Sequence, residues 1–163
     1  MKLHRWIVVV AIVAVGTMPA MAGDGIFSKA PLTDLRGDVD PTDGGWAVAS
    51  ATVAEGRTSV VLNVKDLDRS QVGRTLGAHV HIGPCVEGQG GLALGHYNAG
   101  GGVSPATEVW LDITITRGGT GHAQAVVPFE ISSGAAHSVV IHGDPTAPSG
   151  AAGPRLACIP LEF

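Results

Sequence analysis

The chain has 163 residues, with ten lysines and arginines, fourteen aspartates and glutamates, and a net charge of −4 when histidine is neutral. This length suffices for one domain with a sizeable hydrophobic core. A mildly acidic chain without blocks of basic residues argues against nucleic acid as a partner.

The first 22 residues have the layout of a secretory signal peptide. Lys2 and Arg5 supply a positive start, an apolar run covers residues 6–15, and residues 20–22 form a small-residue cleavage site, Ala-Met-Ala. An uncleaved membrane anchor is the alternative, although the apolar run falls short of the roughly 20 residues that span a bilayer. We therefore expect an exported protein, periplasmic or extracellular, that is free of the membrane after cleavage.

Two regions follow the signal peptide. Residues 23–45 are rich in Asp, Gly, Pro and Thr and show no period, which predicts a flexible lead-in. From residue 46 to 163, alternating apolar and polar residues predict short strands, at 46–53, 60–64, 109–116, 123–129, 138–142 and 155–161. Glu55-Gly56 predicts the turn between the first two strands, and residues 117–121 predict the turn from 109–116 to its return strand. With no amphipathic helix, this pattern predicts an all-β domain, an antiparallel sandwich or barrel.

The chain has seven histidines, and their placement is its strongest functional signal. Two of them, His79 and His81, form an HxH pair. Positions i and i+2 of a strand point to the same side, so both imidazoles can converge on one metal ion. An HxH pair alone is also compatible with two ordinary surface histidines.

Four short segments follow one another along the chain, three with histidines and one with an arginine and a cysteine. They are HVHIGPC from His79, GHYN around His96, SVVIH ending at His142, and GPRLAC ending at Cys158. In this ordered set the chain resembles the copper/zinc superoxide dismutase family over about residues 46–163. The resemblance implies a Greek-key β-sandwich or barrel and an enzyme that converts superoxide to oxygen and hydrogen peroxide.

The resemblance also implies roles for single residues. His79, His81 and His142 would ligate copper, and His96 would be the histidine that bridges copper and zinc in the zinc-containing relatives. Arg155 would be the arginine that attracts and orients the anionic substrate, which suits a permanently charged guanidinium. A surface arginine that forms a loop salt bridge is the alternative for Arg155.

Cys85 and Cys158 are the chain's two cysteines. Two cysteines in an exported protein more often form a disulfide than remain free, although two buried thiols are the alternative. They match the family's intrasubunit disulfide. No CxxC pair is present, so a cysteine zinc site has little support.

The chain departs from the zinc-containing relatives in two places. No histidine lies between His96 and Thr120, where the two further zinc ligands would be, and only twelve residues separate His142 from Arg155. Their absence together resembles the copper-only branch of the family, so we expect copper and no zinc site. His122 and His137 match no family position, and we expect both to be exposed to solvent.

Without zinc, another group must orient His96, because a metal-bound histidine usually donates its second N–H to a carboxylate or carbonyl. Glu108 and Asp112 share one face of the predicted strand at 109–116 and its approach. Either could accept this proton, and we prefer Glu108. The alternative is that both are solvated positions on an outward face.

The predicted function is therefore that of an exported copper-dependent superoxide dismutase. A rival is a copper-binding protein for buffering or delivery without turnover, which would keep the four histidines but would not require Arg155. A purely structural or adhesive sandwich leaves the histidine set unexplained. No sequence feature indicates an oligomeric state.

Overall fold

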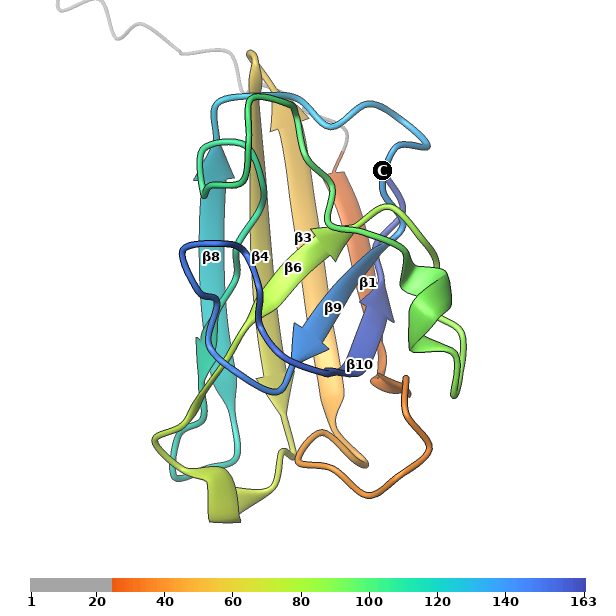
Figure 1. Ribbon diagram of the computed structural model, residues 1–163, viewed down its shortest axis with the longest axis vertical. Coiled ribbons are helices and arrows are strands. Elements are labelled where there is room, and N and C mark those ends of the chain that lie inside the picture. Colours follow the sequence, from red (N-terminus) through yellow and green to blue (C-terminus); the bar gives the residue numbers. More distant parts are fainter. Residues whose placement is uncertain (1–24) are drawn as a thin grey trace, which may run out of the picture.

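The computed structural model describes residues 25–163, so the predicted signal peptide at 1–22 lies outside the described residues. The described chain is all-β and its sheets are antiparallel, as in a β-sandwich (Figure 1). One sheet has the order β1-β3-β4-β8, which are Gly25–Pro31, Trp46–Ala54, Arg57–Lys65 and Gly121–Val127. The second has the order β2-β10-β9-β6, which are Thr33–Asp34, Arg155–Pro160, Ser138–His142 and Ala78–His81. Strands β5 (Thr75–Leu76) and β7 (Ile113–Thr114) form a separate pair, and two short 3-10 helices are η1 (Arg69–Gln71) and η2 (Gly90–Ala93).

The β3–β4 hairpin forms where the sequence predicts it. Ala54 pairs with Arg57, and the two residues between them, Glu55 and Gly56, have φ values of 55° and 74°. Positive φ at both positions gives the turn whose twist matches that of paired strands. The hairpin is therefore set by local sequence.

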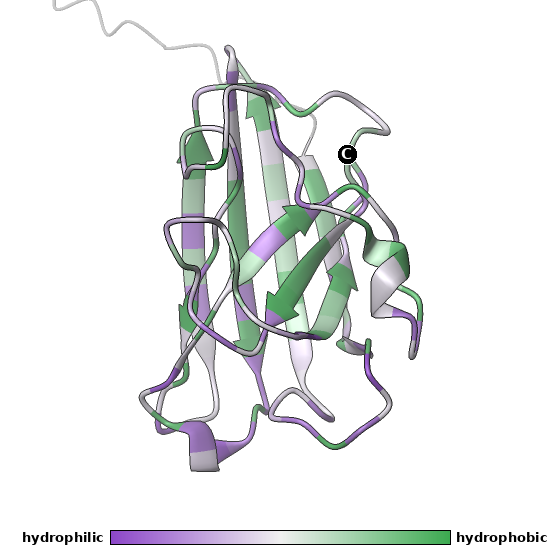
Figure 2. Ribbon diagram, in the orientation of Figure 1, coloured by the Kyte–Doolittle hydropathy of each residue, from purple (hydrophilic) through white to green (hydrophobic). Residues whose placement is uncertain are grey.

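The core lies between the two large sheets and is built from alternate positions of each strand. Its members include Ala49 and Leu62 from the first sheet and Val80, Ile141 and Ile159 from the second. Figure 2 shows these apolar strand segments against a more polar periphery of turns and loops. Since alternate residues face opposite sides, the neighbours of Val80 and Ile141 point away from the core, toward the outside of the second sheet.

The predicted flexible lead-in at 23–45 is wrong for the segment that forms β1 and β2. Strand β1 pairs with β3 along its whole length, from Gly25 opposite Thr52 to Pro31 opposite Trp46. Its inward positions are Ile26, Ser28 and Ala30, and Phe27 on the outward side is 67% exposed, so apolar and polar residues do not alternate cleanly along this strand. Backbone pairing along the free edge of β3 forms this strand without that pattern.

The predicted hairpin between 109–116 and 123–129 is also absent. Val109, Leu111, Ile113 and Ile115 are all buried, as their alternation predicts, but only Ile113–Thr114 forms a ladder, with β5. The expected return strand begins at Gly121 as β8 and pairs with β4 instead. Alternating apolar and polar residues indicate which side of a segment is buried. They do not determine which strand it pairs with, because that depends on which sheet has an open edge beside it.

Candidate metal centre

Four histidines meet on the outer side of the second sheet. His79 and His81 lie on β6, His142 ends the neighbouring strand β9, and His96 reaches them from the loop after η2 through a bridge to His81. One nitrogen of each ring lies within 4.8 Å of the others, so the group could bind a metal ion. His79, His81 and His142 are buried, whereas the side chain of His96 is 19% exposed.

Each ring has one nitrogen held by the surrounding protein. Nδ1 of His81 lies 3.2 Å from the carbonyl oxygen of Leu94, and Nδ1 of His142 lies 3.3 Å from that of Gly153. A carbonyl only accepts hydrogen bonds, so both Nδ1 atoms carry the proton. The two Nε2 atoms are then unprotonated, and they face each other at 3.3 Å.

In His79 it is Nε2, and not Nδ1, that makes the hydrogen bond to the surrounding protein. Its Nε2 lies 2.8 Å from Oγ1 of Thr146, whose hydroxyl donates to a carboxylate oxygen of Asp112. Because the threonine proton is committed to Asp112, the hydroxyl must accept from Nε2 of His79. Nδ1 of His79 is therefore unprotonated, and it is fully buried without a hydrogen-bond partner.

This arrangement fits a metal ion. A buried polar atom without a partner costs about 1–3 kcal/mol, and unprotonated nitrogens that face one another repel unless a cation lies between them. Burial lowers the pKa of His79 to about 2, of His81 to about 3 and of His142 to about 4. These three imidazoles are therefore neutral near pH 7, which is the form that binds a metal.

Glu108 orients His96. Its Oε2 accepts hydrogen bonds of 2.9 Å from Nδ1 of His96 and from Nε1 of Trp110, and its Oε1 accepts one of 3.0 Å from Asn98. Burial alone would raise the pKa of this carboxyl, but the three donors outweigh that effect and hold the pKa below its usual range. Glu108 is thus an ionised carboxylate, although it is only 4% exposed.

Asp112, the other carboxylate considered for His96, is directed to a different histidine. It accepts hydrogen bonds from the backbone N–H of Thr146, at 2.9 Å, and from the hydroxyl of the same residue. It thereby positions the hydroxyl that contacts Nε2 of His79. Sequence reasoning did not single out Thr146 or Trp110. Their roles depend on the loop at 143–154 folding back onto the segment around residue 110, and no local pattern encodes that contact.

A β-bulge places Arg155 beside the histidines. Arg155 pairs with His142 but Ala157 pairs with Ile141, so Leu156 is the extra residue of β10. Without this bulge Arg155 would share the core-facing side with Ile159, because one residue of shift exchanges the two faces of a strand. The bulge instead directs Arg155 to the side of His142.

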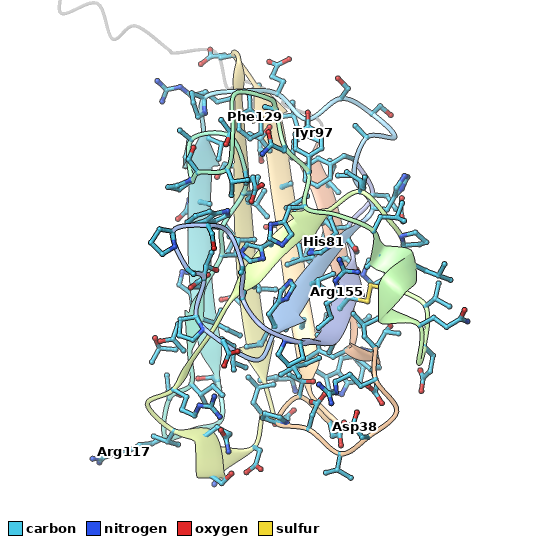
Figure 3. The ribbon with its side chains drawn as sticks, viewed as in Figure 1. Asp38, His81, Tyr97, Arg117, Phe129 and Arg155 are labelled. Atoms are coloured by element: carbon cyan, nitrogen blue, oxygen red, sulfur yellow. A yellow bond between two sulfur atoms is a disulfide. The ribbon has the colours of Figure 1, made fainter. Side chains whose placement is uncertain are left out.

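Arg155 lines an open cleft of about 540 Å³ together with His96, Glu108 and His142. The guanidinium of Arg155, which is labelled in Figure 3, donates to the backbone carbonyls of Gly90 and Leu94. The salt-bridge alternative would instead require a carboxylate partner. Burial lowers the pKa of Arg155 from its usual value, but a guanidinium stays charged near neutral pH. The cleft therefore holds a positive charge next to the histidines.

A disulfide joins Cys85 to Cys158. Cys85 lies in the loop after β6 and Cys158 lies within β10, packed with Leu35, Ala93 and Val140. The bond ties the loop that covers the histidines to the strand that carries Arg155.

The two remaining histidines of the described chain lie outside the cluster. His122 on β8 is exposed, as expected, and its Nδ1 is 2.8 Å from Oδ1 of Asn63. His137 is half-buried, contrary to that expectation, and its Nδ1 is 2.5 Å from Glu162.

In residues 25–163 no helix has the length and apolar character needed to cross a membrane. No known protein-family model matches this chain, and no curated protein matches it either. The function is therefore inferred from the site itself, in which a buried group of four histidines can hold a metal ion beside a charged cleft.

Proposed function

We propose that this chain is an exported, copper-dependent superoxide dismutase of Greek-key topology, belonging to the copper-only branch of the copper/zinc family. Two superoxide anions and two protons would give one oxygen molecule and one hydrogen peroxide molecule. The observation that carries the proposal is the convergence of unprotonated imidazole nitrogens on one point, in a cleft that also contains Arg155.

The donor set supports copper. Four imidazoles meet without a thiolate or carboxylate among the converging groups. Imidazole suits copper, zinc, iron and nickel, and among divalent first-row metals copper binds such sites most tightly. We propose that copper is held by His79, His81, His96 and His142, with Glu108 holding His96 in place of a second metal.

Bound copper would supply one-electron redox chemistry, accepting an electron from one superoxide and returning it to the next. The chain's residues supply the rest. The cleft admits a small anion, and Arg155 attracts and orients it. Glu108 keeps the proton on Nδ1 of His96, so that Nε2 of this ring is free. His96 is the most exposed of the four rings, so its Nε2 would be the one best placed to take up a solvent proton for the product whenever it does not ligate the metal.

Copper binding for buffering or delivery is the alternative. It would use the same four histidines but would not need a cation in the cleft. The bulge in β10, which takes Arg155 from the core-facing side to the cleft, favours the enzyme.

The test is to load metal-free protein with copper, zinc or both, and to measure metal content, copper affinity and dismutation. We expect one copper per chain, no tightly held zinc, and dismutation that falls as salt screens Arg155. In Arg155→Gln, one copper per chain should stay bound, because the guanidinium binds no metal, and any loss of affinity would measure how far its hydrogen bonds to Gly90 and Leu94 hold the loop that carries His96. Its dismutation should drop several-fold at low salt and depend less on salt.

Arg117→Gln is the matched control, because it removes the same charge from an exposed turn far from the cleft (Figure 3). It should retain its activity and its salt dependence. Copper-loaded protein without dismutation would favour the storage alternative, and stoichiometric zinc beside copper would contradict the copper-only assignment.

A further inference from the structure

A second surface with a distinct chemistry lies on the outer face of the β1-β3-β4-β8 sheet. These four strands contain three of the chain's ten lysines and arginines, Lys29, Arg57 and Lys65, and none of its fourteen aspartates and glutamates. All three cations occupy exposed positions on the outward side of their strands. A sheet without a carboxylate stands out in a chain whose net charge is negative.

Large apolar side chains are exposed on the same outer face. Phe27 is 67% exposed, Trp46 is 38% exposed and Val126 is 56% exposed. Polar side chains lie among them: Phe27 on β1 pairs with Ser50 on β3, and Gln124 on β8 lies beyond Val61 of β4 in the same cross-strand row. The face therefore alternates apolar contacts with hydrogen-bonding groups, unlike the contiguous apolar patch of a typical protein interface.

The chemistry is concentrated in a groove around Trp46. Its lining includes the indole of Trp46, Val48, Asn63 and the two lysines, Lys29 on β1 and Lys65 on β4. Nζ of Lys65 lies 5.8 Å from the centre of the indole ring. The groove thus presents a mainly apolar surface that includes the indole, and two of the side chains that line it, from strands on either side of β3, end in ammonium groups.

The size and charge of the groove indicate its ligand. Its volume of about 110 Å³ is well below the roughly 300 Å³ of a site that encloses a drug-sized molecule. It fits one ring of a polymer that lies along the sheet. A sugar ring offers C–H groups to the indole and hydroxyls to the small polar side chains, and a carboxylate on that ring pairs with the lysines.

We propose that this face binds an acidic polysaccharide of the uronic acid class, with one ring seated at Trp46. Charge complementarity between the carboxylate-free sheet and a polyanionic chain carries the choice of partner. Nζ of Lys65 also forms an ion pair with Oδ2 of Asp66 at 3.2 Å, but both side chains are 59% exposed. Such an ion pair contributes at most about 1 kcal/mol, so a ligand carboxylate can replace it.

The position of this face leaves the histidine cluster free. The outer face belongs to the first sheet, whereas the four histidines lie on the outer side of the second sheet, across the core. Binding here would hold the protein on an acidic polymer while the cleft stays open to solvent. The proposal is independent of the metal's identity and can be tested on metal-free protein.

The experiment measures the affinity of metal-free protein for polygalacturonate, with neutral dextran as the reference polymer. We expect binding to polygalacturonate alone, weakened by salt. Lys29→Gln combined with Lys65→Gln should raise the dissociation constant at least tenfold, as should Trp46→Ala. Trp46→Phe, which keeps an aromatic ring, should stay within about threefold, and cooperative thermal unfolding of Trp46→Ala itself checks that this variant is folded.

The matched control combines Arg69→Gln with Arg117→Gln, which removes two exposed positive charges outside the four strands. It should change the affinity less than twofold. Equal weakening by both double variants would overturn the proposal in favour of general charge attraction, and absence of binding at low salt would overturn it outright. A homodimer that Trp46→Ala dissociates would assign the face to self-association instead. Dismutation by copper-loaded protein should be unchanged in all these variants, so this test and that of the proposed function can fail separately.

Discussion

At the level of single residues, the site depends on which ring nitrogen carries a proton. Backbone carbonyls hold the protons of His81 and His142, Glu108 holds that of His96, and Thr146 holds that of His79. Each contact leaves the other nitrogen of its ring free at the shared centre. Such contacts are known to tune metal sites, and losing one typically costs 10–100-fold in affinity.

Replacing Glu108 with glutamine tests this arrangement. Glutamine offers one acceptor oxygen to the three donors that Glu108 now satisfies, Nδ1 of His96, Nε1 of Trp110 and the amide of Asn98. We expect the copper affinity of Glu108→Gln to fall about 10–100-fold, with an altered spectrum of the bound Cu(II). Glu87→Gln, an exposed site with the same charge change, should have no effect. Unchanged affinity and spectrum in Glu108→Gln would remove Glu108 from this role.

At the level of elements, the site joins a rigid ladder to covering loops. Strands β6 and β9 pair from Ala78 opposite Ile141 to His81 opposite Ser138, and this pairing sets the spacing of three of the histidines. The loop that carries His96 is held from outside, by Arg155 on β10 and by the disulfide. The position of Arg155 and that of this loop are therefore coupled.

Removing the disulfide should separate fold stability from the placement of Arg155. The two cysteines are 73 residues apart in sequence, and for a loop of that size the chain-entropy model gives a stabilisation of about 4 kcal/mol. We expect Cys85→Ala combined with Cys158→Ala to lower the melting temperature and to reduce dismutation while copper stays bound. A shift of about 1 Å in a guiding residue can cost a large factor in rate. Full activity at unchanged stability would contradict this coupling.

At the level of the whole molecule, the two large sheets carry different surfaces on their outer sides. One carries the histidines and the open cleft, and the other carries the groove around Trp46, on strands that contain no aspartate or glutamate. The shared core couples both to global stability, so stability is the property that reports on the buried histidines without any metal.

The metal-free protein should lose stability as the pH falls below about 6.5. His79, His81 and His142 stay neutral in the folded state, because burial lowers their pKa values to about 2, 3 and 4. In the unfolded chain they take up protons near their ordinary pKa of about 6.5. Their contribution is thus fully present above that pH. It is lost on acidification at up to about 1.4 kcal/mol per pH unit for each histidine.

Urea unfolding of the metal-free protein at pH 7.5, 6 and 5 measures this dependence. His142→Asn removes one of the three groups, so its free energy of unfolding should change less steeply with pH over the same range. A free energy of unfolding that stays constant between pH 7.5 and 5 would show that these histidines are not buried and neutral in the metal-free fold.

Local sequence is sufficient for the features that depend on neighbouring residues. The Glu55-Gly56 turn depends on two adjacent φ values, and the shared face of His79 and His81 follows from the two-residue period of a strand. The burial of Val109 and Leu111 follows from the same period, although the strand expected there is largely absent.

Tertiary structure decided what depends on residues far apart in the chain. Pairing with β3 turned the segment at 25–31 from an expected flexible lead-in into a strand. A single extra residue in β10 set the face of Arg155, and a fold-back of the loop at 143–154 brought Thr146 between Asp112 and His79. The physical reason is that backbone pairing and hydrogen bonding stabilise contacts between residues that are close in space, however far apart they lie in the sequence. Side-chain periodicity, by contrast, records only which face of a segment is buried.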